Sequence, residues 1–157
     1  MTELGDHQAQ RRYHMNNLYQ TDFYAWTQEQ AKLLKTQHLF ELDIDNLVEE
    51  LESLGRKERQ ELRNRLAVLI GHLLKWQYQP QNRSNSWLAT IREQRSQIQI
   101  LLVESPSLKP YLAEAFTLSY PSAVNLAVQD TNLAYETFPH TNPFTLLEVT
   151  NPEFLPV

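Results

Sequence analysis

The chain has 157 residues, of which 41% are hydrophobic and 21% charged, and its net charge is −5. This length and composition are typical of one globular domain, and the absence of cysteine excludes disulfides, thiolate nucleophiles and sulfur-ligated metal sites. No apolar run approaches the ~20 residues of a membrane span, and the N-terminus lacks the apolar stretch of a secretory signal, so we expect a cytoplasmic protein.

Positive charge is concentrated in the middle of the chain. Residues 56–95 contain nine Lys and Arg against three Glu, a net charge of +6, whereas the remainder carries five basic and sixteen acidic residues, a net charge of −11. Such asymmetry is expected of a polyanion-binding face, and equally of basic and acidic helices that pair with each other. Internal pairing is the favoured interpretation, because an acidic protein repels phosphate chains at long range.

Two helices are predicted in the first half of the chain. The first begins at Thr21 or Asp22, either of which can cap it, and ends near Thr36. Asp43 is predicted to cap the second. The apolar stripe of this second helix consists of Ile44, Leu47, Val48, Leu51 and Leu54. Gly55 either ends the helix or makes a small-residue contact within a longer one.

Proline limits the helices of the second half. Pro80 is predicted to end the long helix, and a third helix is predicted over residues 87–103. A shorter helix is predicted to begin at Ser107, and Pro121 to break it before another short helix. The rest is predicted to be extended, with one short helical piece at residues 144–149.

No segment shows the apolar and polar alternation expected of a half-buried β-strand. The predicted fold class is therefore all-α: an irregular bundle of four to six helices with a proline-rich, extended C-terminal segment. Residues 1–16 are predicted to form a mobile N-terminal tail, and residues 17–157 a single helical domain.

Helical periodicity places several polar side chains among apolar residues. Steps of 3.6 residues put Glu58 on the apolar face of the long helix, His72 at the edge of that face, and Arg95 at the centre of the third helix's stripe. A charge in a core is costly unless it is paired, so Arg95 is expected to meet Glu58 or Glu50. The sequence therefore predicts a buried polar cluster of Glu50, Glu58, His72 and Arg95.

The same cluster has two interpretations. In a hydrolase, Glu58 or Glu50 would be a general acid or base, His72 its partner and Arg95 an anion clamp. A structural network that sets helix register is favoured, because buried ion pairs often shift pKa values without doing chemistry. No Glu precedes a His by three residues, as helical di-metal sites require. We therefore assign no catalytic residue, no cofactor and no metal site.

The segment 75–95 suggests nucleic-acid binding as an alternative. The candidate phosphate contacts are Lys75, Arg83 and Arg92, beside the aromatic residues Trp76, Tyr78 and Trp87. An aromatic residue at a helix end beside an apolar stripe is more often part of the core than a stacking platform. A basic stripe without a recognised motif is also weak support for this function.

Four segments in order resemble a known family. They are DFYAWTQEQAKLL (22–34), DIDNLVEELESLGRKER (43–59), HLLKWQYQP (72–80) and RSNSWLATIREQR (83–95). Together with SPSLKPYLAEAF and NPFTLLEVTNPEFLP, they resemble the bacterial domain-of-unknown-function family twenty-nine, which is abundant in photosynthetic bacteria. The resemblance implies an all-helical single domain in a soluble bacterial protein. It implies no established activity, substrate or catalytic residue.

These observations favour a non-enzymatic helical interaction or regulatory module. Its expected partner is another protein or a second copy of the chain, bound through apolar surface on the long helices. The alternative function is binding or processing of RNA or single-stranded DNA through residues 75–95. No cofactor and no membrane association are expected.

Overall fold

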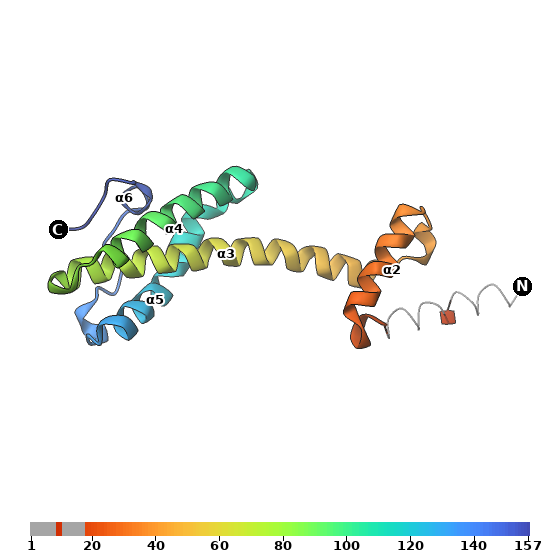
Figure 1. Cartoon of the computed structure of the whole chain (residues 1–157), viewed down its shortest axis with the longest axis horizontal. Helices are drawn as coiled ribbons and strands as arrows, with labels where there is room; N and C mark the ends of the chain where they lie inside the picture. Colours follow the sequence, from red (N-terminus) through yellow and green to blue (C-terminus); the bar gives the residue numbers. More distant parts are fainter. Residues whose placement is uncertain (1–8, 11–17) are drawn as a thin grey trace, which may run out of the picture. The chain divides into compact units, whose positions relative to one another are not determined.

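The computed structural model describes residues 9–10 and 18–157, and these residues form helices and connecting segments without a strand (Figure 1). Among the described residues, the α-helices from Phe23 onward are α2 (Phe23–Lys35), α3 (Ile44–Tyr78), α4 (Asn85–Glu104), α5 (Leu112–Thr131) and α6 (Leu146–Thr150). The 3-10 helices are η1 (Leu39–Glu41), η2 (Pro80–Asn82), η3 (Pro106–Tyr111) and η4 (Tyr135–Thr137). The predicted all-α class is confirmed. The predicted tail, residues 1–16, lies outside the described residues except for residues 9 and 10.

The chain divides into two compact units, Met1–Gly55 and Arg56–Val157, which we call unit 1 and unit 2. Helix α3 contributes its first turns to unit 1 and its remainder to unit 2. The single domain over residues 17–157 stays a prediction, because two compact units can unfold either together or separately.

Unit 1 is built on contacts between α2 and the start of α3. Asp22 caps α2, as predicted, since its carboxylate accepts a hydrogen bond from the backbone N–H of Ala25 at 3.0 Å. The indole Nε1 of Trp26 donates to the Asp43 carboxylate at 3.0 Å. The backbone N–H of Asp43 donates to the side-chain oxygen of buried Gln30 at 2.9 Å. Asp43 therefore ties the beginning of α3 to α2.

The hydrophobic core of unit 1 is small. Among its described residues, the buried hydrophobic side chains are Trp26, Leu33 and Leu42, and Leu47 is partly buried against the two leucines. Small units bury a smaller fraction of their unfolded surface than large ones, so their stability is marginal. Each of these side chains therefore carries a large share of the stability of unit 1.

Helix α3 runs without interruption through Gly55, which agrees with the longer of the two predicted helices. A Cβ atom at Gly55 would meet no atom within 4 Å, so close packing does not require glycine there. Gly71 is different, because a Cβ atom there would lie 2.8 Å from the Leu126 side chain and 3.1 Å from the Ala123 carbonyl oxygen. The missing side chain at Gly71 lets α3 and α5 approach closely.

Unit 2 contains the main hydrophobic core. Figure 1 shows α4 and α5 alongside the C-terminal half of α3. From α3 the core takes Leu62, Leu66, Leu69, Ile70, Leu73 and Leu74. The core also takes side chains from α4, α5 and the segment after α5, residues 132–157, which we call the C-terminal segment. These are Ile91, Ile98, Leu101, Ala115, Tyr120, Ala123, Ala127, Phe138, Phe144 and Val149. Three helices and the C-terminal segment therefore share one core.

The prediction that Pro121 breaks its helix is wrong, because α5 continues through this residue. Proline removes the backbone hydrogen bond to the carbonyl four residues earlier, which belongs to Thr117. Both residues are exposed, so water can reach that carbonyl. Ala115, Ala123 and Ala127 are fully buried on either side of the proline, and their packing offsets the lost bond.

The C-terminal segment closes unit 2. Helix α6 begins with a capping box, in which Thr145 and Glu148 each accept a hydrogen bond from the other's backbone N–H. The helical piece predicted at residues 144–149 is thus found slightly later in the chain. Phe144 and Val149 are buried on either side of this cap and anchor the segment to the core.

Candidate functional site

The four residues of the predicted polar cluster lie in different environments. In unit 1, the Glu50 carboxylate accepts a hydrogen bond from the Tyr19 hydroxyl at 2.6 Å. In unit 2, Glu58 is exposed and accepts a 3.3 Å hydrogen bond from the Ser105 hydroxyl. His72 follows Glu58 by fourteen residues on α3, which is about 21 Å at 1.5 Å per residue. The predicted cluster is therefore wrong, and the hydrolase hypothesis loses the arrangement on which it depends.

Arg95 is buried, as predicted, with 8% of its surface exposed, but it does not pair with a carboxylate of α3. Its guanidinium donates hydrogen bonds to the backbone carbonyls of Val149 at 2.8 Å, Pro152 at 3.2 Å and Phe154 at 2.8 Å. Burial lowers the pKa of Arg95, and the negative charge of Glu153 acts in the opposite direction. Arg95 thus fastens the C-terminal segment to α4.

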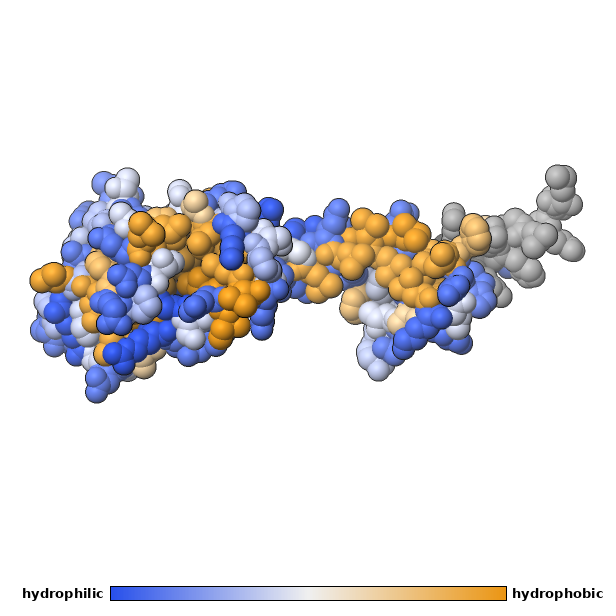
Figure 2. Space-filling view, turned by 90° about the horizontal axis from the view of Figure 1, so that it is seen from above, coloured by the Kyte–Doolittle hydropathy of each residue, from blue (hydrophilic) through white to orange (hydrophobic). Residues whose placement is uncertain are grey.

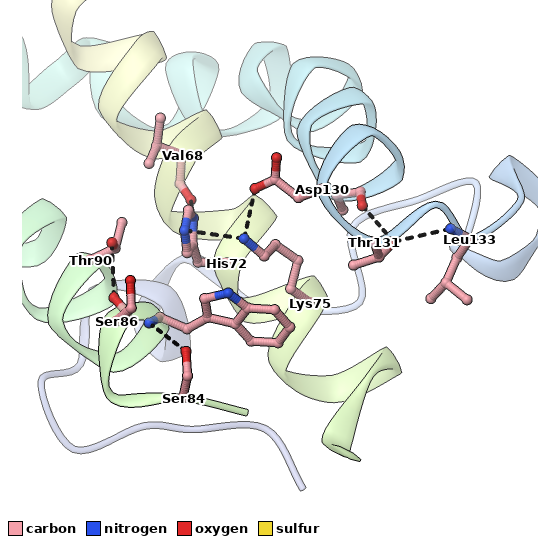
Figure 3. Close-up of polar contacts among 11 residues, drawn as sticks. Val68, His72, Lys75, Ser84, Ser86, Thr90, Asp130, Thr131 and Leu133 are labelled. Atoms are coloured by element: carbon pink, nitrogen blue, oxygen red, sulfur yellow. Dashed lines mark hydrogen bonds and ion pairs between the residues drawn. The ribbon is translucent and has the colours of Figure 1, made fainter. Parts of the chain in front are cut away.

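A different polar cluster surrounds Lys75 in the core of unit 2 (Figure 3). Lys75 is 3% exposed. Its Nζ lies 2.7 Å from the Asp130 carboxylate, 3.4 Å from Nε2 of His72 and 4.6 Å from the ring centroid of Trp87. The buried ammonium group therefore contacts an anion, a ring nitrogen and the face of an aromatic ring. Through these contacts it joins α3, α4 and α5.

The hydrogen bonds of His72 define its protonation. Nδ1 lies 2.9 Å from the Val68 backbone carbonyl, which only accepts, so Nδ1 carries the proton. Nε2 then accepts a hydrogen bond from the Lys75 ammonium group. Burial lowers the pKa of His72, and the positive charge of Lys75 lowers it further, against the Val68 carbonyl and Asp130. The imidazole is therefore neutral near pH 7, and its Nε2 is already occupied.

We expect the free energy of unfolding to decrease as the pH falls below 6.5, with His72 causing part of the decrease. The folded-state pKa of His72 lies below the reference value of 6.5, so the unfolded chain binds the proton first and acid favours unfolding. Urea denaturation at several pH values between about 7.5 and 5 measures the effect. His72→Gln should flatten the pH dependence, whereas His140→Gln, at an exposed position, should not. An unchanged slope in His72→Gln would contradict the assignment.

The three predicted nucleic-acid contacts differ in exposure. Arg83 and Arg92 are exposed, but the prediction of Lys75 as an outward-facing contact is wrong, because it is buried. The Arg83 guanidinium lies 5.2 Å from the ring centroid of Trp76, and its Nε donates to the Trp76 carbonyl at 2.8 Å. Lys75 likewise lies against the ring of Trp87. One ring face of Trp76 and one of Trp87 are thus covered by cations of this chain, so these faces are not open to base stacking.

Unit 2 also has a groove of about 790 Å³, lined by α3, α4, η3, α5 and the C-terminal segment; we call it the α4 groove. Three basic residues, Arg92, Arg95 and Lys109, line it. The two arginines were predicted from the sequence for other reasons, whereas Lys109 and Glu153 were not predicted. These two residues reach the groove from segments that no local motif connects to α4.

Apolar surface is concentrated on unit 1. Nine of the fifteen exposed large hydrophobic side chains of the described residues belong to it, although unit 2 is the longer unit. Four of them, Ile44, Val48, Leu51 and Leu54, follow one another along α3 and are 48% to 67% exposed; we call them the α3 stripe. The others are Phe23, Tyr24, Leu34, Leu39 and Phe40. Figure 2 shows this apolar surface over α2 and the first half of α3.

Within the described ranges, no three His, Asp or Glu side chains lie close enough together to hold a metal ion. None of the helices described above is both long and apolar enough to cross a membrane. No curated protein and no solved structure matches the chain significantly. A family model described as domain of unknown function DUF29 matches residues 18–155, which include all of α2 to α6. The chain therefore belongs to the family of domain of unknown function DUF29.

Proposed function

We propose that the protein is a helical interaction module, that the α3 stripe is its binding surface, and that a second copy of the chain is its partner. The observation that carries the proposal is the exposure of Ile44, Val48, Leu51 and Leu54 on one helix. A contiguous apolar surface on a protein of this size is typical of an interaction site. The small core of unit 1 supports the same conclusion, because covering the stripe would supply the apolar burial that this unit lacks.

The spacing of the stripe fits a helical partner. Its members are separated by four, three and three residues, the pattern that brings apolar side chains to a seam between two helices. Leu47 points into the small core of unit 1 with Leu33 and Leu42. One side of α3 thus packs on its own unit while the stripe remains accessible to another helix.

The charges along α3 favour an antiparallel arrangement of two copies. Residues 45–52 contain four acidic residues and no basic ones, whereas residues 56–59 contain three basic residues and one Glu. If Leu51 of one copy faces Leu54 of the other, the acidic stretch of each helix lies beside the basic stretch of its partner. This pairing is self-complementary, as a two-fold symmetric dimer requires, and opposite charges beside an apolar seam set orientation.

We expect Leu51→Glu to shift the protein from dimer to monomer. A carboxylate at the centre of the stripe would have to lose its water in the dimer, which costs several kcal/mol. Sedimentation equilibrium of wild type and variant measures the change in mass. Leu118→Glu is the matched control, because Leu118 is also an exposed leucine, on α5 and outside the stripe (51% exposed, against 67% for Leu51). A wild-type protein that stays monomeric at every soluble concentration would refute the proposal.

The absence of native cysteine allows the orientation to be tested by crosslinking. In the antiparallel pair, Leu54→Cys lies close to its own copy across the symmetry axis and should form a disulfide-linked dimer. Ile44→Cys would be separated from its copy by about 25 Å along the helix axis, at 1.5 Å per residue, and should not. Efficient crosslinking of Ile44→Cys would instead show a parallel pair.

The alternative, binding of RNA or single-stranded DNA, has less support. Of its three candidate contacts, Arg83 and Arg92 are exposed and Lys75 is buried. Because Arg83 also lies against Trp76, few groups in residues 75–95 are free to contact a polyanion.

A further inference from the structure

The α4 groove combines an apolar lining with an excess of positive charge. Leu69 is fully buried beneath it, Ile98 is 3% exposed, and Leu102 and Leu112 are half-buried in its lining. Its volume of about 790 Å³ lies within the range of pockets that bind small molecules. A bound alkyl chain or ring would therefore leave water and contact the hydrophobic core of unit 2.

The charges around the groove favour an anion. Arg92, Arg95 and Lys109 line it together with one acidic residue, Glu153, so its net charge is +2 in a chain whose net charge is −5. The partners of Arg95 are neutral carbonyls, so its positive charge is not cancelled by them. No described residue forms an ion pair with Arg92 or Lys109, which are both exposed.

We propose that the α4 groove binds a small anionic amphiphile, a molecule with one carboxylate or phosphate group on an apolar body. Arg92 contacts the anionic group, since a guanidinium group can form two parallel hydrogen bonds with it, and the charge of Lys109 adds to the positive potential of the groove. The apolar body lies over Ile98, Leu102 and Leu112. Neither half of the ligand binds tightly alone. Burial of the apolar body does not fix the orientation of the ligand, and the two exposed cations are well solvated, so each attracts a free anion only weakly.

The C-terminal segment forms one wall of this site. Thr150, Pro152 and Glu153 line the groove. Arg95 holds the backbone around them through its hydrogen bonds to the carbonyls of Val149, Pro152 and Phe154. Arg95 is thus a positioning residue for the wall. The Glu153 carboxylate repels the anionic group of the ligand, so it limits the affinity of the site.

Calorimetry with decanoate tests the proposal on the full chain. We expect saturable binding of decanoate at one site, at least tenfold tighter than that of decanol, and no binding of acetate or of decyltrimethylammonium. Vesicles containing phosphatidylglycerol distinguish the sources of the ligand. Binding of decanoate without vesicle binding assigns the groove to free amphiphiles, and binding of both assigns it to lipids. Equal affinity for decanoate and decanol would overturn the proposal.

Four variants locate the binding. Arg92→Gln should weaken decanoate binding about tenfold, the loss expected when one charged hydrogen-bonding partner is removed. Glu153→Gln should strengthen it a few-fold, whereas Lys57→Gln, which removes an exposed cation outside the groove, should not change it. Ser96→Trp should abolish binding by filling the groove from an exposed position on α4. Undiminished binding in a folded Ser96→Trp variant would place the ligand elsewhere and refute the assignment.

Discussion

Replacing Arg95 with methionine is expected to lower the free energy of unfolding by about 3 kcal/mol. The substitution keeps an unbranched apolar stem but removes donors from the carbonyls of Val149, Pro152 and Phe154. The Arg95–Val149 hydrogen bond is fully buried, and a buried carbonyl without a donor costs about 1–3 kcal/mol. Water can reach the other two carbonyls in part, so their loss adds less.

Urea denaturation of wild type, Arg95→Met and Arg92→Met measures this effect. Arg92 is an exposed arginine on the same helix, so Arg92→Met should change stability by less than about 0.5 kcal/mol. Hydrogen exchange should also accelerate in Arg95→Met at the backbone amides of residues 150, 151 and 153–155. Equal stabilities of the two variants would show that the three carbonyl bonds contribute nothing net.

The burial of Arg95 could be predicted from the sequence, but its partners could not. Periodicity within one helix places this residue on the apolar face of α4. Its acceptors lie 54 to 59 residues further along the chain. They are also backbone carbonyls, which every residue has, so no residue type marks them. A pairing rule based on charge therefore pointed to Glu58 or Glu50. In the structure Glu58 is exposed, and Glu50 accepts a hydrogen bond from Tyr19.

The burial of Lys75 was missed for a different reason. Periodicity along α3 defines one apolar stripe, and Lys75 lies outside it. In unit 2, however, α3 packs against both α4 and α5, so Ala67, Ile70 and Leu74 are buried as well as Leu62, Leu66, Leu69 and Leu73. The buried arc of a central helix is wider than a single stripe. Asp130, which neutralises Lys75, is 55 residues away in the sequence.

Local sequence signals predicted where helices begin more reliably than they predicted which residues pack against each helix. The predicted cap Asp22 begins α2 through a hydrogen bond that spans three residues, and Ser84 caps α4 in the same way. The spacing also identified the residues of the α3 stripe, together with Leu47, which instead packs in the core of unit 1. Periodicity identifies an apolar face but does not say what covers it, and this is why the exposure of the stripe required the structure.

Replacing Trp26 with alanine is expected to unfold the described part of unit 1. Trp26 is 2% exposed, its ring lies 4.9 Å from that of Tyr19 and 5.5 Å from that of Phe23, and it bonds to Asp43. Truncating a buried tryptophan costs about 3–5 kcal/mol. Because only two other hydrophobic side chains of the described part of unit 1 are buried, this loss exceeds what the remaining contacts can offset.

Hydrogen exchange resolved by residue measures where the Trp26→Ala chain unfolds. Amides of α2 should lose protection, and those of the last five turns of α3 and of α5 should keep it. Trp26→Phe should cost only about 1–2 kcal/mol, because it keeps an aromatic ring and loses one hydrogen bond. Phe40→Ala removes a 93% exposed ring and should have no effect. If α5 loses protection together with α2, the two units unfold as one, as the predicted single domain over residues 17–157 requires.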